Sequence, residues 1–135
     1  MPEYPLERLL QEAAGWWATL PPGAVVWLSG DLGTGKTTLV QALAKAAGAA
    51  AARSPTFALI HEYPSPAGPL IHVDCYRLRD PSEALDLDFP DLVRRARLLV
   101  IEWPERAGRH APPPNLHLRL SHGRGPDLRV VERVA

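Results

Sequence analysis

The sequence predicts an α/β fold: a three-layer sandwich with a mostly parallel sheet and a C-terminal antiparallel hairpin. Three observations favour this fold. Segments of helical periodicity alternate with short apolar runs that are typical of buried strands. One of these runs, residues 24–29, leads through glycines directly into a predicted helix. Near the C-terminus, two stretches of alternating apolar and polar residues flank the turn sequence GRGP.

The predicted strands share a high content of Val, Ile and Leu and are bounded by turn residues. They lie at 24–29, 57–63, 70–76 and 98–102. The connection PSPAGP between the second and the third strand carries three prolines, which indicates a turn or a loop. LHLRLS and DLRVVERV form the predicted terminal hairpin.

Apolar residues at helical spacing predict a first helix over 6–20, ended by the prolines and the glycine that follow it. A second helix is predicted from Lys36 to about Ala47, with a glycine beyond its end. A third is expected to begin at Asp80, which can cap it and is followed by a proline suited to a first turn. That helix is predicted to break around Phe89 and to resume as far as Arg97.

Composition predicts a globular chain of one domain, residues 1–135. Apolar residues make up 46% and charged residues 22%. Basic and acidic residues both number 15, so a broad electrostatic interaction with nucleic acid is not expected. Cys75 has no second cysteine to pair with and is expected to be a small buried apolar residue. No apolar run approaches the roughly 20 residues of a membrane span, and a cytoplasmic location without membrane contact is expected.

The segment GDLGTGKT, Gly30 to Thr37, satisfies the pattern G-x-x-x-x-G-K-[ST]. Its glycines let backbone N–H groups surround phosphates, and the helix that follows points its positive end at the anion. Lys36 can reach the β- and γ-phosphates, and the Thr37 hydroxyl can bind magnesium. A strand before the motif and a helix after it argue against a chance match. The loop therefore predicts a nucleoside triphosphate site in a P-loop NTPase-like sandwich.

The base is expected to be adenine, and the triphosphate ATP. The Asn-Lys-x-Asp element by which GTPases read guanine is absent from the sequence. No Asp-x-x-Gly switch follows the strand that carries Asp74 either.

Two acids stand where apolar runs end, Asp74 and Glu102. Such positions lie beside the ligand crevice of an open α/β sheet, and a P-loop protein needs a carboxylate there for magnesium. Each acid alone could be a satisfied strand-end residue, but the pair beside a phosphate loop favours the catalytic interpretation. His72 is interpreted as a packed residue in preference to one that orients a neighbour. Thr56, in Ser-Pro-Thr-Phe, is equally compatible with a γ-phosphate sensor and with a capped turn.

Taken together, GDLGTGKTT, SPTF, HVDCYR and IEWPE occur in the order found in the TsaE family, also called YjeE, which the chain resembles. The resemblance is strong over 30–105 and weaker as far as Gly123 and Arg124. It implies a small bacterial ATPase of tRNA threonylcarbamoyladenosine biosynthesis, weak alone and working with the TsaB–TsaD heterodimer. Its ATP cycle would reset that complex, and tRNA would be contacted only indirectly.

The resemblance also implies a set of site residues. Gly33 to Thr38 would surround the phosphates, and Thr37 and Glu102 would bind magnesium. Asp74 would be the acid of the second nucleotide motif, Thr56 would belong to a switch-like loop, and Arg124 would lie near the nucleotide. The residues expected to contact the nucleotide are Gly30, Gly33, Thr34, Gly35, Lys36, Thr37, Thr38, Thr56, Asp74 and Arg124.

The expected reaction is hydrolysis of the β–γ bond, with Lys36, Asp74 and Glu102 as the catalytic candidates. Glu105 is a further candidate for orienting the water. No arginine finger is evident within the P-loop core, so a partner would supply that cation. Two alternatives are a small-molecule kinase, whose lid would be the arginine-containing segment 77–97, and a binding module that ATP occupancy controls without hydrolysis.

Overall fold

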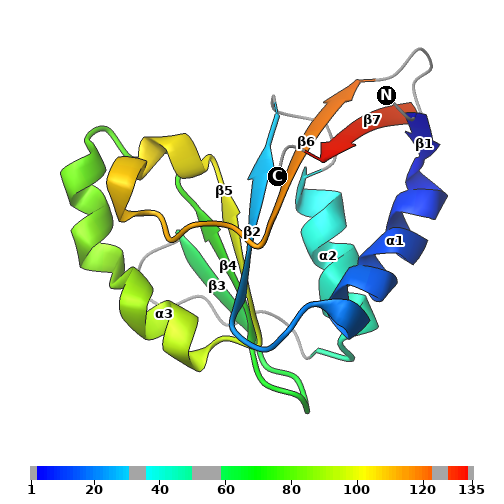
Figure 1. The fold of residues 1–135 in the computed structure, drawn as a ribbon, viewed down its shortest axis with the longest axis horizontal. Helices are drawn as coiled ribbons and strands as arrows, with labels where there is room; N and C mark the ends of the chain where they lie inside the picture. Colours follow the sequence, from blue (N-terminus) through cyan, green and yellow to red (C-terminus); the bar gives the residue numbers. More distant parts are fainter. Residues whose placement is uncertain (1–2, 31–35, 50–58, 123–127, 134–135) are drawn as a thin grey trace.

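The computed structural model describes residues 3–30, 36–49, 59–122 and 128–133. Its strands form one sheet in the order β1-β7-β6-β2-β5-β4-β3 (Figure 1). The strands are β1 Glu3–Pro5, β2 Ala24–Ser29, β3 Ile60–Tyr63, β4 Leu70–Asp74, β5 Leu98–Glu102, β6 Leu116–His122 and β7 Leu128–Arg133.

The centre of the sheet is parallel and its margins are antiparallel. Strands β6, β2, β5 and β4 run in one direction, whereas β3, β7 and β1 pair in the antiparallel sense. The predicted parallel sheet with its terminal hairpin is thus confirmed. Strand β1 was not predicted, because three residues are too short to show a period. Since β2, β4 and β5 are parallel, the loop after β2 and the acids ending β4 and β5 share one edge.

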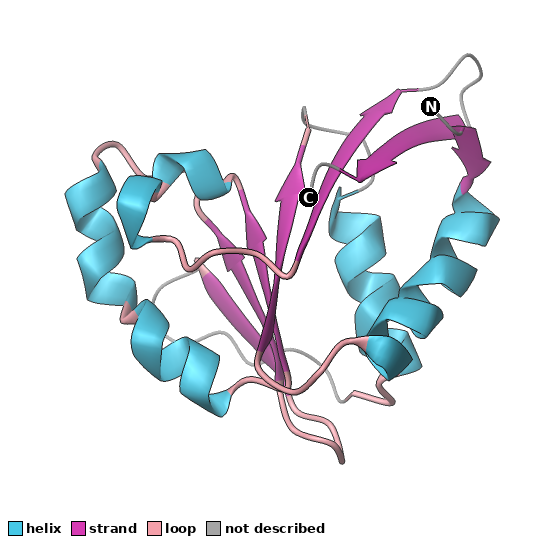
Figure 2. Ribbon diagram, viewed as in Figure 1, coloured by secondary structure: helices cyan, strands magenta, loops and turns pink. Residues whose placement is uncertain are grey.

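Helices cover both faces of the sheet, as the sandwich prediction requires (Figure 2). Helices α1 (Leu6–Thr19) and α2 (Lys36–Ala46) pack on one face, and η1 (Pro81–Leu87) and α3 (Phe89–Arg95) on the other. The alternation of side chains along β2 explains the two cores. Val26 and Leu28 belong to the cluster shared with α2, whereas Val25 belongs to the cluster shared with α3.

The third predicted helix needed a correction. Asp80 caps its start as expected, accepting a hydrogen bond from the backbone N–H of Ser82 at 2.8 Å, but the segment is the 3-10 helix η1. Asp88 then adopts left-handed geometry (φ 52°) and separates η1 from α3. The next residue but one, Pro90, has no N–H to continue the earlier turns. Helix α3 ends at Arg95 because Arg97 instead donates its N–H to the carbonyl of Pro69 at 2.8 Å.

Strand β4 is shorter than predicted. It ends at Asp74 because the backbone N–H of Tyr76 turns back to Oδ1 of Asp74, at 3.0 Å. This local turn replaces the continuation of the strand to residue 76. Strand β3 begins at Ile60, and residues 57 and 58 of its predicted range lie outside the described residues.

Two short 3-10 helices, η2 (Pro104–Arg106) and η3 (Gly108–His110), follow β5. Cys75 is fully buried, as expected of a small apolar residue. Within the described ranges, no helix is long and apolar enough to cross a bilayer.

Candidate nucleotide-binding site

The connection from β2 to α2 has the strand–loop–helix order that the phosphate motif requires. Strand β2 ends at Ser29, and α2 begins at Lys36. Gly30, the first glycine of the motif, has φ 135°, a backbone region that other residues rarely adopt. The N-terminus of α2 therefore lies at the end of this loop, where its free N–H groups favour an anion. Gly33, Thr34 and Gly35 lie outside the described residues.

Lys36 is the first residue of α2, and its side chain is held over the end of β2. The residue is only 5% exposed, and its Nζ donates a hydrogen bond to the carbonyl oxygen of Gly30. The same Nζ lies 4.2 Å from the centroid of the Trp103 ring. A buried ammonium needs such partners, and an aromatic face supplies one of them. The cation thus stands beside the first residue of the phosphate motif.

Thr37 and Thr38 occupy the next two positions of the first turn of α2. Thr37 is exposed and Thr38 is partly buried. The Thr37 hydroxyl is therefore accessible to a ligand at the helix N-terminus. Among the described residues, no hydrogen bond joins it to Glu102, the other predicted magnesium ligand.

The two predicted acids come together at the carboxyl edge of the sheet. Asp74 of β4 is the register partner of Glu102 of β5. By the alternation along each strand, both side chains lie on the same face as Leu70 and Val100, which is the face that α2 covers. Oδ1 of Asp74 accepts the Tyr76 N–H, so Asp74 is also a strand-end residue with a structural bond.

Glu102 is almost fully buried, at 4% exposed. Its Oε2 lies 2.7 Å from Nε2 of His72, which is itself 6% exposed. In the described part of the chain, nothing donates a hydrogen bond to Oε1. Simple packing was the favoured interpretation of His72 from the sequence, but in the structure His72 both packs and binds Glu102. Its position two residues before Asp74 on one strand face was the signal that could have indicated this.

Trp103, which was not among the predicted site residues, also lies at this edge of the sheet. It has left-handed geometry (φ 55°, ψ 50°), which is unfavourable for a side chain of this size and is often found at functional sites. Its ring lies 5.1 Å from the Tyr76 ring, and the guanidinium of Arg106 lies 5.8 Å from it. The chain reversal after Glu102 thus brings an aromatic ring onto Lys36.

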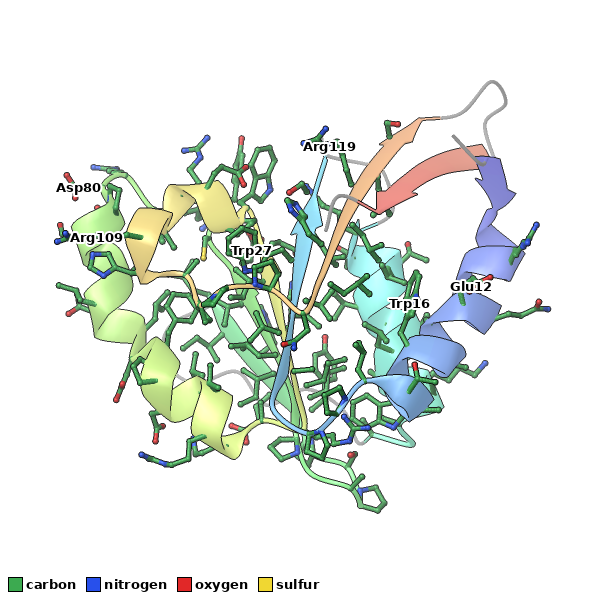
Figure 3. The ribbon with its side chains drawn as sticks, in the orientation of Figure 1. Glu12, Trp16, Trp27, Asp80, Arg109 and Arg119 are labelled. Atoms are coloured by element: carbon green, nitrogen blue, oxygen red, sulfur yellow. The ribbon has the colours of Figure 1, made fainter. Side chains whose placement is uncertain are left out.

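A cavity of about 550 Å³ adjoins Gly30 on the face of the sheet that α2 does not cover. Trp27 of β2 and Arg119 of β6 both line it (Figure 3). Also in its wall, Oγ of Ser29 and Nε2 of His117 are 2.7 Å apart. Burial lowers the pKa of His117 from its usual value, and the charge of Arg119 lowers it further.

Thr56 and Arg124, both expected near the nucleotide, lie outside the described residues. Their roles stay predictions. Of the residues that the structure does describe, the chain brings Gly30, Lys36, Thr37, Thr38, Asp74 and Glu102 to one edge of the sheet.

The described residues are suited to magnesium that is also held by nucleotide phosphates, rather than to a metal ion held by protein side chains alone. The described residues contain no group of three or more His, Cys, Asp or Glu that could hold a metal ion. Magnesium is usually held by one or two carboxylates together with phosphate oxygens and water. Oε1 of Glu102, without a hydrogen-bond partner in the described part of the chain, and the exposed Thr37 hydroxyl meet that description.

Comparison with known proteins gives a consistent family. The family model described as "Threonylcarbamoyl adenosine biosynthesis protein TsaE" matches residues 6–130. Curated proteins named tRNA threonylcarbamoyladenosine biosynthesis protein TsaE are similar to the chain. The protein from Nostoc sp. is 41% identical over 110 residues, which cover 78% of this chain and 67% of that protein. The protein from Streptomyces coelicolor is 38% identical over 121 residues, covering 85% and 80%.

A third relative, from Aquifex aeolicus, is 45% identical over 85 residues, which cover 61% of this chain and 59% of that protein. The chain thus spans less than two thirds of the Aquifex protein. Among solved structures, Bacillus subtilis YdiB is similar, with a TM-score of 0.75 and 26% identity over 96% of this chain and 82% of that one. A family model that matches nearly the whole chain, together with these relatives, shows that the chain belongs to the TsaE family.

Proposed function

We propose that this protein is a magnesium-dependent P-loop ATPase that acts in the biosynthesis of threonylcarbamoyladenosine in tRNA. One observation carries the ATPase proposal: the buried Lys36 ammonium bound at Gly30, beside the strand that ends in the buried Glu102. Leu28, two residues before Gly30, is the register partner of Glu102. The names of the TsaE relatives support the pathway.

In the proposed reaction, a water oxygen bonds to the γ-phosphorus while the bond from that phosphorus to the bridging oxygen breaks. ADP, phosphate and a proton are released. Lys36 and the N–H groups at the start of α2 stabilise the negative charge that the phosphate oxygens carry. Thr37 and Glu102 would hold magnesium, which supplies further positive charge when bound. Asp74 and Glu102 would position the water.

The proposed partner is the TsaB–TsaD heterodimer, with tRNA reached only through that complex. Three arginines before β5, Arg94, Arg95 and Arg97, have partners away from the phosphate loop, which is consistent with a cation supplied by a partner. Arg95 binds Asp91 through Nε at 2.9 Å, and Arg94 binds the same carboxylate. Arg97 donates to the carbonyl of Trp17 at 2.8 Å. An arginine finger can be worth ~10³–10⁵ in rate, so its absence would make the isolated protein slow.

The same contacts argue against the small-molecule kinase. A kinase lid needs arginines that can close over the phosphates, and segment 77–97 was the candidate. Its last three arginines are engaged by helix α3, by strand β3 through Glu62, and by helix α1. Arg97 precedes β5, so it stands at the amino edge of that strand, opposite the phosphate loop.

The experiment is to measure ATP turnover by this chain with and without TsaB–TsaD, while following tRNA modification over several cycles. We expect free phosphate as the product, faster release with the heterodimer, and modification that stops after about one cycle without this chain. A phosphorylated small molecule in place of free phosphate would instead support the kinase. Full multi-cycle modification with a non-hydrolysable ATP analogue would show that occupancy suffices and would overturn the ATPase role.

A further inference from the structure

We infer that His72 is a positioning residue, which holds the carboxylate of Glu102 so that one oxygen faces the magnesium nucleotide. This inference rests on the proposed function, because it concerns the same carboxylate. Nε2 of His72 and Oε2 of Glu102 are 2.7 Å apart, and both residues are more than nine-tenths buried. Their strands, β4 and β5, are paired in parallel along their whole length.

The direction of the hydrogen bond follows from the chemistry of the two groups. A carboxylate oxygen can only accept, so Nε2 of His72 carries the hydrogen and donates it. The bond occupies Oε2 and leaves Oε1 without a hydrogen-bond partner among the described residues. Hydrogen bonds that orient a ligating carboxylate are a common feature around metal sites. The geometry therefore assigns Oε2 to the orienting hydrogen bond from His72 and leaves Oε1 to face magnesium.

Packing alone does not explain a histidine at this position. On the same face of β4, the preceding inward residue is Leu70, which is fully buried and apolar. A buried imidazole costs stability unless its polar atoms are paired. The partner that compensates this cost is Glu102, 30 residues away in the sequence.

The surroundings of His72 also hold its ring in place. The ring stacks on His61 of β3, with the centroids 5.7 Å apart and the planes inclined by 25°. His61 is the cross-strand partner of His72 in the antiparallel β3–β4 pair. Among the residues that the structure describes, His61 makes no hydrogen bond to Glu102, and its buried Nδ1 has no hydrogen-bond partner. It therefore offers a matched control, because it supplies a ring without supplying the donor.

The test compares three variants for metal binding rather than turnover. His72→Phe keeps a planar ring but has no donor. His72→Gln can present an amide N–H near the position of Nε2. His61→Phe changes the stacked ring alone. For each, binding of Mn²⁺ and of Mg²⁺ to the ADP-loaded protein is measured by electron paramagnetic resonance of free Mn²⁺ and by competition, and ADP affinity is measured without metal.

We expect His72→Phe to weaken metal binding by ~10–100-fold while ADP binding without metal is kept. His72→Gln should restore most of the affinity, and His61→Phe should change it by less than about threefold. Rescue by Gln distinguishes orientation from packing, since a packing role would be served better by Phe. Equal metal affinity in the wild type and His72→Phe would overturn the inference.

If His72→Phe does not fold, His72→Asn replaces it, because the asparagine amide is too short to reach Oε2. Metal affinity of His72→Asn equal to that of His72→Gln would then overturn the inference. Failure of the proposed function would look different. In that case the wild type itself would bind no Mn²⁺ that depends on ADP, and the variants would not be needed to see it.

Discussion

The two ends of the central parallel strands have opposite characters. At the amino ends, Leu70 and Leu98 are register partners, both fully buried and apolar. At the carboxyl ends of the same strands, Asp74 faces Glu102, with Lys36 close to the end of β2. The amino ends contribute stability through burial, whereas the carboxyl ends carry buried charge and an unfavourable backbone at Trp103. The same strands therefore support the core at one end and the candidate site at the other. Leu70 and Asp74, at the two ends of β4, are only four positions apart.

The largest effect is expected from Lys36→Ala, which removes the cation at the carboxyl end. Nucleotide turnover should fall by about 100-fold or more, because charge on the phosphate oxygens loses its stabilisation. Thermal unfolding should change little, since the alanine suits a helix start. Lys45→Ala, at the exposed end of α2, is the matched control and should keep turnover. Wild-type turnover by Lys36→Ala, measured as phosphate release, would refute the assignment.

Glu102→Gln tests the charge at the carboxyl end of β5 while a side chain of similar size remains there. The side chain keeps its size and can still accept a hydrogen bond from His72, but it loses the charge that magnesium prefers. We expect the magnesium concentration for half-maximal turnover to rise by roughly 10-fold or more, in the range seen when metal-site groups are changed. Magnesium titration of phosphate release checks this. Superimposable curves for the variant and the wild type would mean that Glu102 is structural.

Leu98→Ala tests the amino end. Removing a fully buried leucine should lower the free energy of unfolding by about 2–5 kcal/mol, because it leaves a cavity beside Leu70. Urea unfolding measures this change, and ADP affinity of the folded variant should stay near that of the wild type. Leu85→Ala, at a side chain 63% exposed, serves as the control with little loss. A large loss of ADP affinity in folded Leu98→Ala would break the separation of the two ends.

The smallest effect is expected from a change of pH, which acts on His117 in the wall of the cavity beside Gly30. Burial and then Arg119 lower the pKa of His117 in the folded protein, so the unfolded chain binds this proton more readily. The stability from neutral His117 is complete above its ordinary pKa of ~6.5, and it is lost as the pH falls from there through the lowered pKa of the folded state. His117→Gln, which can keep a bond to Ser29, should flatten the fall in unfolding midpoint between pH 8 and pH 5.5. An identical pH profile would contradict this.

Much of the site could be predicted from local sequence. The phosphate motif is a contiguous stretch whose spacing reflects the size of a phosphate group, and Lys36 takes the start of α2 as that motif requires. Asp74 and Glu102 could be paired in advance because each ends an apolar run, and parallel strands bring their carboxyl ends together.

Other parts of the site depend on contacts that no local pattern contains. The hydrogen bond from His72 to Glu102 requires the register of β4 against β5, so a single strand pattern predicted only packing for His72. Trp103, whose ring lies beside Lys36, has a left-handed backbone conformation that a tryptophan does not favour by itself. Strand β1 owes its existence to pairing with β7, since three residues show no period of their own.

The sequence by itself determined the kind of site: a phosphate loop between a strand and a helix, with acids at the ends of neighbouring strands, because these depend on periodicity and short spacing. The tertiary structure alone decided how the charges are held. Residues 30 or more positions apart, such as His72 and Glu102, meet only when the strands pair in one register. Because these groups are buried, each charge needs such a partner, since an unpaired charge in the interior would be too unfavourable.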